Sequence, residues 1–107
     1  MLEKRVIVTL VDSRITATYP NGKRMFVDLS QLQQVDVLTN DSGPWGLDVW
    51  WILKSTDGEC RFPQDAQIQA EVLDNLFALK DFDELKFIRA MGSTSHQEFV
   101  CWARKFK

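Results

Sequence analysis

The first two thirds of the chain show two patterns typical of β-strands. Val6–Val11 is an apolar run rich in β-branched residues, whereas in runs such as Arg14–Tyr19 apolar and polar residues alternate with a period of two. Short polar breaks separate the runs, and Asn21-Gly22 stands between two of them, where this dipeptide favours a tight hairpin. Ser30 is expected to cap a single helical turn. The segment 40–46 contains two glycines and a proline, so we expect a loop there. The pattern predicts six strands, at Val6–Val11, Arg14–Tyr19, Arg24–Leu29, Gln34–Thr39, Leu47–Lys54 and Glu59–Phe62.

After the sixth strand, the apolar residues recur at helical spacing. They predict a helix over Ala66–Leu79 with Asp65 as its N-cap, and a second helix that begins after Asp83 and ends at Gly92. A last strand is predicted over Gln97–Ala103. The predicted fold class is α+β: a curved antiparallel sheet or partial barrel of about six to seven strands, packed against two C-terminal helices, with a final strand.

The composition is that of a single globular domain spanning residues 1–107, because 45% of the residues are hydrophobic, 26% are charged and 11% are aromatic. So many large rings can bury enough apolar area for a stable core without a metal or a disulfide. Cys60 and Cys101 are expected to be buried thiols, and the sequence leaves open whether they lie close together. Two cysteines and one histidine have no ligand spacing, so we expect no metal and no cofactor.

The N-terminus shows neither the apolar stretch nor the cleavage site of a signal peptide. The longest apolar runs, such as Val49–Leu53, are too short to cross a bilayer. We therefore expect a cytoplasmic protein with no membrane span. The oligomeric state cannot be read from these features.

Charge is unevenly distributed along the chain, although the net charge is only −2. Between Asp28 and Leu85, twelve acidic residues stand against three basic ones, a net charge of −9, whereas the two ends together carry +7. Such asymmetry bears on partners rather than on the fold. It disfavours a nucleic acid as the partner and favours a basic protein, unless the acidic residues serve solubility alone.

The predicted strand Leu47–Lys54 presents two different faces if its residues alternate. One face carries Trp51 and Leu53 and is expected to meet the helices, whereas the other carries Trp50 and Ile52 beside acidic residues. Large apolar side chains with a polar rim are typical of protein interfaces. Alternatively, the last strand or the curvature of the sheet covers Trp50, which then belongs to the core. The candidate partner-binding residues are Asp36, Asp41, Trp45, Asp48 and Trp50.

An enzyme site is considered at His96, the single histidine, which follows several hydroxyl residues. A catalytic nucleophile needs a base within hydrogen-bond reach and a third group that orients the base, and no third group is close in sequence. Turn formation explains the hydroxyl residues more simply. We therefore predict no catalytic residues and no enzyme activity.

A second alternative is an anion site at the tip of the first hairpin. Lys23 and Arg24 lie at this tip, and Lys4, Arg5 and Arg14 are close to it if the first strands pair. Such a cluster suits an anionic lipid or a small anionic ligand. Basic residues at a hairpin end also serve simply to solvate it and to discourage edge pairing.

The order of the predicted elements resembles that of bacterial pleckstrin-homology-like domains. The resemblance covers residues 5–79 and rests on the Asn21-Gly22 turn, the Leu29–Leu32 turn, the Trp-rich strand and the Asp57-Gly58 hairpin, followed by a helix. The second helix and the last strand depart from that pattern. The segments Phe87–Thr94 and Phe99–Trp102 are similar to the tail of small uncharacterised bacterial proteins, some of which resemble immunity proteins encoded beside toxins.

The resemblance carries over no residue roles, because immunity proteins share no catalytic motif. Together with the charge asymmetry, it predicts a non-enzymatic protein-binding domain, in concrete form a cytoplasmic immunity protein that neutralises a cognate toxin by covering a basic active site. The acid-rich middle of the chain would approach the partner, and Trp45 or Trp50 would anchor it. The alternative is a pleckstrin-homology-like module that binds an anionic lipid or small ligand through the basic hairpin.

Overall fold

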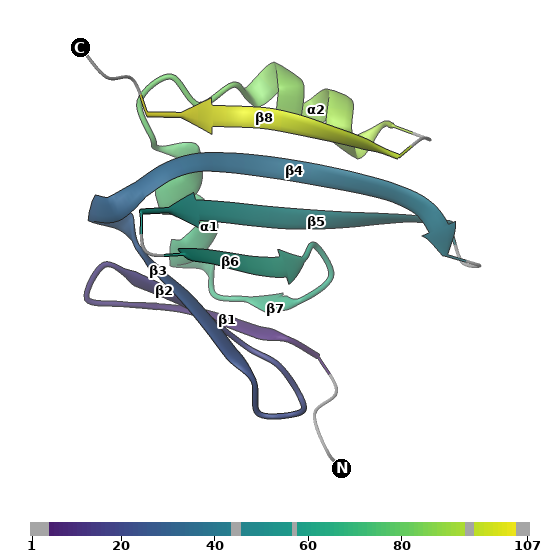
Figure 1. The fold of residues 1–107 in the computed structure, drawn as a ribbon. Helices are drawn as coiled ribbons and strands as arrows, with labels where there is room; N and C mark the ends of the chain where they lie inside the picture. The colour runs from purple at the N-terminus through teal and green to yellow at the C-terminus, as the bar shows by residue number, and fades with distance from the viewer. Residues whose placement is uncertain (1–4, 44–45, 57, 94–95, 105–107) are drawn as a thin grey trace.

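The computed structural model describes residues 5–43, 46–56, 58–93 and 96–104, and for residues 41–43 and 46–48 it describes the backbone alone. Within these ranges, eight strands form two four-stranded sheets and are accompanied by two helices (Figure 1). The first sheet has the order β3-β2-β1-β7, and the second has the order β6-β5-β4-β8. The elements are β1 (Ile7–Val11), β2 (Arg14–Thr18), β3 (Arg24–Asp28), the 3-10 turn η1 (Leu29–Gln31), β4 (Leu32–Gly43), β5 (Gly46–Ser55), β6 (Gly58–Pro63), β7 (Gln67–Ile68), α1 (Ala70–Phe77), α2 (Glu84–Met91) and β8 (Gln97–Ala103).

Two tight hairpins build the first sheet. β1 turns into β2 through Asp12 and Ser13, whose φ angles of 49° and 69° are those of a two-residue turn that matches the twist of the strands. β2 turns into β3 at the predicted Asn21-Gly22 site, where Gly22 has a φ of 90° and donates its N–H to the Tyr19 carbonyl at 2.9 Å. A side chain would be strained at that φ, which explains the glycine.

The chain changes sheets at η1, so the predicted single sheet is wrong. The Asp28 side chain accepts a hydrogen bond from the Ser30 N–H at 2.9 Å and caps this turn, whereas Ser30 was the predicted cap. β4 is not paired with β3; it pairs with β5 and with β8, and both pairings are antiparallel. The two sheets do not close into a barrel.

The strand β4 is longer than predicted, because it continues to Gly43 through part of the expected loop. A register shift between Asn40 and Gly43 accommodates the extra residues in the β4–β5 ladder. Sequence patterns do not detect such a bulge, because it interrupts the alternation on which they rest.

The helix α1 begins at Ala70 rather than at Ala66, so the predicted N-cap at Asp65 is wrong. The residues before it form β7, which pairs with β1 in parallel. The N–H of Gln67 donates to the Val6 carbonyl at 2.8 Å, and the N–H of Gln69, just after β7, donates to the Val8 carbonyl at 2.9 Å. A long-range parallel pairing thus replaces the first turn of the helix.

The helix α2 agrees with its end signals. The Asp83 side chain accepts a hydrogen bond from the Lys86 N–H at 3.0 Å, and Gly92 lies at the C-cap. No helix in the described part of the chain is long and apolar enough to cross a membrane.

The core lies between the first sheet, the two helices and one face of the second sheet, which we call the inner face. Trp51 is fully buried at its centre. Its ring lies 5.2 Å from that of Phe87 and 5.9 Å from that of Phe77, and Phe62 and Phe82 lie within 6.5 Å. In Figure 1 both helices lie behind the second sheet, and the opposite face, which we call the outer face, is turned to the viewer.

Candidate functional site: the outer face of the second sheet

The outer face is assembled from three adjacent strands by their register. Asp36 on β4 pairs with Ile52 on β5 and with Val100 on β8, and Leu38 pairs with Trp50 on β5. Because side chains on paired positions point to the same side of a sheet, these residues share the face opposite Trp51. The remaining described members are Gln34, Asn40, Lys54, Glu59, Arg61, Pro63 and Glu98.

Burial on the outer face is graded. Asp36 is 0% exposed and Ile52 is 2% exposed, although Ile52 does not belong to the hydrophobic core cluster. Leu38 and Trp50 are half-buried, and Val100 is 38% exposed. The centre of the face is therefore covered by its own neighbouring side chains, while large apolar groups beside it reach solvent.

An ion cluster occupies the middle of this face. Lys54 Nζ lies 2.9 Å from Asp36 Oδ2 and 3.5 Å from Glu98 Oε2, so one ammonium group bridges carboxylates of β4 and β8. Gln34 Nε2 donates a hydrogen bond to Asp36 Oδ1 at 2.8 Å. The side chains of Lys54 and Glu98 are 40% and 45% exposed, so the cluster is buried at Asp36 and open to water at its ends.

The proximity of these groups changes their proton affinities. Burial alone raises the pKa of Asp36, but hydrogen bonds from Glu98, Lys54 and Gln34 outweigh it, and the pKa lies below its ordinary value. The pKa of Glu98 is raised, first because its carboxyl group shares a hydrogen bond with Asp36. The pKa of Lys54 is raised chiefly by its hydrogen bond to Asp36. On acidification, Glu98 therefore takes up a proton before Asp36 does.

The structure brings together Asp36 and Trp50, two of the five predicted site residues, on the outer face. The backbone of Asp48 is opposite Asn40 in the same ladder. The side chains of Asp41 and Asp48 and the whole of Trp45 lie outside the described residues. Asp36 cannot itself touch a partner in this state, because it is fully buried and Lys54 covers it.

Sequence analysis missed Glu98 and Val100 as members of the outer face. Both lie on β8, which pairs with β4 across about sixty residues of chain. Their alternation within β8 assigns them to one face of that strand, but it contains no information on which strand lies beside it.

The first sheet holds the predicted basic residues. Arg14 and Arg24 lie on its surface on either side of Phe26, and the Arg14 guanidinium sits 4.7 Å from the centre of that ring. Lys23 is exposed at the hairpin, and Lys4 lies outside the described residues. His96, the considered catalytic residue, is exposed just before β8.

The two cysteines are buried free thiols, as predicted. Cys60 is on β6 and Cys101 is on β8, the two opposite end strands of the second sheet, so they are too far apart for a disulfide. Burial raises the pKa of Cys60 to about 12 and that of Cys101 to about 11, which disfavours the reactive thiolate. Among the described residues, no cluster of three or more His, Cys, Asp or Glu side chains could hold a metal ion.

No protein-family model, curated protein or solved structure matches this chain.

Proposed function

We propose that this chain is a non-enzymatic protein-binding domain and that the outer face of the second sheet is its contact surface. The observation that carries the proposal is that Val100 is 38% exposed and that half-buried Trp50 and Leu38 form a cross-strand pair on the same sheet face, opposite the face on which the core packs. Exposed large apolar groups rimmed by charged residues are typical of protein interfaces.

The partner we propose is a basic protein. The middle of the chain carries a net charge of −9. The described outer face carries three carboxylates, Asp36, Glu59 and Glu98, against two cations, Lys54 and Arg61. Complementary charge gives fast association that weakens with salt. In the form implied by the sequence resemblance, the partner is a toxin and the chain is its cytoplasmic immunity protein, which acts by covering a basic active site.

The ion cluster has a positioning role in this proposal. Asp36 holds Lys54 across the centre of the face, so the surface that meets a partner consists of the Lys54 stem, Trp50 and Val100 around a pre-formed charge network. Ordered side chains lose little conformational entropy on binding, which favours a tight complex.

The first test is a pull-down with the tagged protein from extracts of the organism that encodes it. We expect it to retain one basic protein at low salt and to lose that protein at moderate salt. With both proteins purified, we expect Trp50→Ala and Val100→Asp each to lower the affinity at least tenfold, because they alter the centre of the contact. Val11→Asp, at an exposed valine on β1, is the matched control and keeps full affinity. Unchanged affinity in both outer-face variants would disprove this surface.

A second candidate function is the binding of an anionic lipid or small ligand at the basic hairpin. The observation that favours it is that Arg14 and Arg24 flank the exposed ring of Phe26 on the first sheet. Charge reversal at Lys23 and Arg24 abolishes this binding, whereas it leaves partner binding by the outer face unchanged.

A further inference from the structure

The strands at the ends of the two sheets differ in how their free backbone edges are covered. On β6, Pro63 has no N–H, and the Arg61 carbonyl accepts the Tyr19 hydroxyl at 2.6 Å. On β8, the Cys101 carbonyl accepts the Asp83 N–H at 2.8 Å. β7 has only two residues. Five-residue β3 is the remaining end strand of the described sheets.

The outward groups of β3 follow from its pairing with β2. The Leu29 N–H donates to the Ser13 carbonyl at 2.8 Å, and the Tyr19 N–H donates to the Lys23 carbonyl at 2.8 Å, one contact at each end of the ladder. Hydrogen-bonded and non-hydrogen-bonded pairs alternate in an antiparallel ladder. With the observed register, the N–H and C=O groups of Arg24, Phe26 and Asp28 therefore point away from β2 and toward the free edge.

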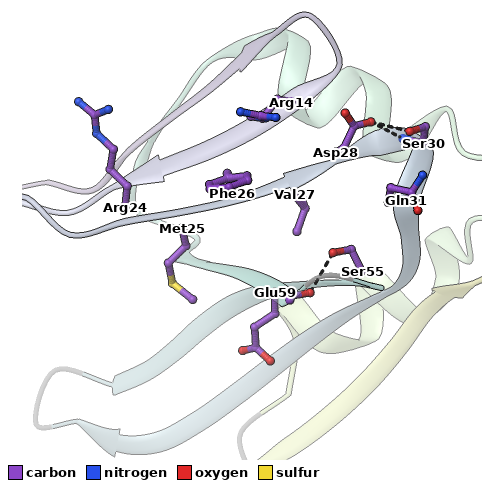
Figure 2. A pocket seen from close by; sticks show the side chains of 11 residues that line it. Arg14, Arg24, Met25, Phe26, Val27, Asp28, Ser30, Gln31, Ser55 and Glu59 are labelled. Atoms are coloured by element: carbon purple, nitrogen blue, oxygen red, sulfur yellow. Dashed lines mark hydrogen bonds between the residues drawn. The ribbon is translucent and has the colours of Figure 1, made fainter.

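A groove of about 440 Å³ runs along this edge. Figure 2 shows β3 on one side and the η1 turn and the β5–β6 hairpin on the other, with Met25 and Val27 pointing from β3 toward that hairpin. Ser55, Gly58 and Glu59 line the hairpin side. Within the described part of the chain, one wall of the groove thus consists of β3 backbone groups that β2 does not bind, with an apolar lining beside it.

The solvent face of this edge carries two guanidinium groups and one carboxylate, so its net charge is positive. The carboxylate is Asp28, which accepts hydrogen bonds from the N–H and the hydroxyl of Ser30 at 2.9 Å and 2.7 Å; these bonds lower its pKa and keep it ionised. On the other wall, Glu59 pairs with Arg61. By contrast, Arg14 lies over the ring of Phe26, which is 56% exposed, and Arg24 is exposed on the same face. Guanidinium groups suit carboxylates, with which they form charge-assisted hydrogen bonds.

We propose that an extended acidic peptide segment of a partner protein adds to β3 as a further strand of the first sheet. Its backbone pairs with Phe26 and its neighbours, its apolar side chains alternate toward Met25 and Val27, and its carboxylates meet Arg14 and Arg24. The backbone edge of β3 belongs to the first sheet, although Glu59 lies at the rim of both surfaces. Loss of peptide binding in the β3 variants and loss of partner binding in the outer-face variants are therefore separate outcomes.

The probe is the blocked peptide acetyl-Val-Glu-Val-Glu-Val-amide, titrated into the ¹⁵N-labelled protein. We expect the amide resonances of Arg24, Phe26 and Asp28 to shift, and their exchange with solvent to slow. The matched peptide with Lys in place of Glu binds at least tenfold more weakly. The double variant Arg14→Glu, Arg24→Glu lowers the affinity for the Glu peptide at least tenfold, whereas Lys86→Glu on α2 leaves it unchanged.

Removing a backbone N–H from the free edge of β3 distinguishes strand addition from simple charge attraction, because only strand addition needs that hydrogen-bond donor. Phe26→Pro removes an N–H that faces the free edge without removing a β2–β3 hydrogen bond, and Phe26→Ala keeps that N–H while it removes the same ring. We expect the proline variant to bind at least tenfold more weakly than the alanine variant. Where Phe26→Pro does not fold, a peptide N-methylated on alternate residues makes the same comparison. Equal binding of the N-methylated and unmodified peptides, or no shift along β3, overturns the proposal.

Discussion

Trp50 and Trp51 are neighbours on β5, yet they belong to regions that are held in different ways. Trp51 is enclosed on the inner face by four phenylalanines from β6, α1, the segment between the helices and α2. Trp50 lies half-buried on the outer face opposite Leu38, beside an ion cluster. The difference shows that residue type does not decide the role of a side chain here. What decides it is whether another layer of the fold packs on its side of the sheet.

The largest effect is expected when the rings of Trp51 and Trp50 are removed in separate variants, because this tests directly whether the two faces of β5 differ in their contribution to stability. Trp51→Ala is expected to lower the free energy of unfolding by about 3–5 kcal/mol, because it leaves a large cavity at the centre of the core. Trp50→Ala is expected to cost less than about 1 kcal/mol, because water replaces part of its surroundings. Urea denaturation of the two variants measures both values. Equal losses would show that the outer face is part of the core.

The next effect concerns the buried carboxylate of the outer face. Asp36→Asn keeps the shape of the side chain but leaves Lys54 without its nearest carboxylate. Because the Lys54 side chain is 40% exposed and can recover water, we expect a loss of about 1–2 kcal/mol, less than for a fully buried pair.

The control for this loss is Lys54→Met in the Asp36→Asn background, which removes the stranded ammonium group and recovers part of the stability. Urea denaturation of the single and double variants measures the free energy of interaction between Asp36 and Lys54. If Asp36→Asn has the same stability as the wild type, then the cluster does not hold the outer face together.

The smallest effect is a change in pH dependence. The raised pKa of Glu98 means that its stabilising contribution is present in the protonated form and is lost as the pH rises through that pKa. The lowered pKa of Asp36 has the opposite sign, so its contribution is present above its unfolded pKa and is lost as the pH falls through the folded one. Glu98→Gln keeps a hydrogen-bond donor toward Asp36 at every pH, so the variant does not lose stability when the pH rises through the Glu98 pKa.

Melting temperatures of the wild type and of Glu98→Gln, measured from about pH 4 to pH 8, test this sign. The wild type is expected to lose stability relative to the variant as the pH rises through the raised Glu98 pKa. Glu59→Gln, whose native partner is Arg61, is the control and should follow the wild type there. Parallel curves for the wild type and Glu98→Gln would contradict the shared hydrogen bond.

Local signals predicted the hairpins and α2 well, because a few adjacent residues decide these structures. Asn21-Gly22 supplies the backbone conformation of its turn, and Asp83 and Gly92 satisfy the two ends of α2. The start of α1 was not predictable in this way. The N–H groups of Gln67 and Gln69 are bound by β1, and that long-range contact overrides a good local N-cap signal.

The candidate site was predictable in part for the same reason. Alternation along one strand separates Trp50 from Trp51, which needs no knowledge of the rest of the chain. The contribution of Glu98 and Val100 depends on β8 lying beside β4, and the burial of Asp36 depends on Lys54 reaching across it. Both are pairings between distant segments, which a single sequence does not reveal.

By itself, the sequence determined the class of the fold, the alternation of the strands, the tight turns and the ends of α2, because these follow from backbone conformation and from the period of apolar residues. Only the tertiary structure decided that the strands divide into two sheets at η1, that β8 lies beside β4, and that Asp36 is enclosed by charged neighbours. The physical reason is that these features rest on long-range pairing and packing. Such contacts depend on the competition between whole strands for the same partners.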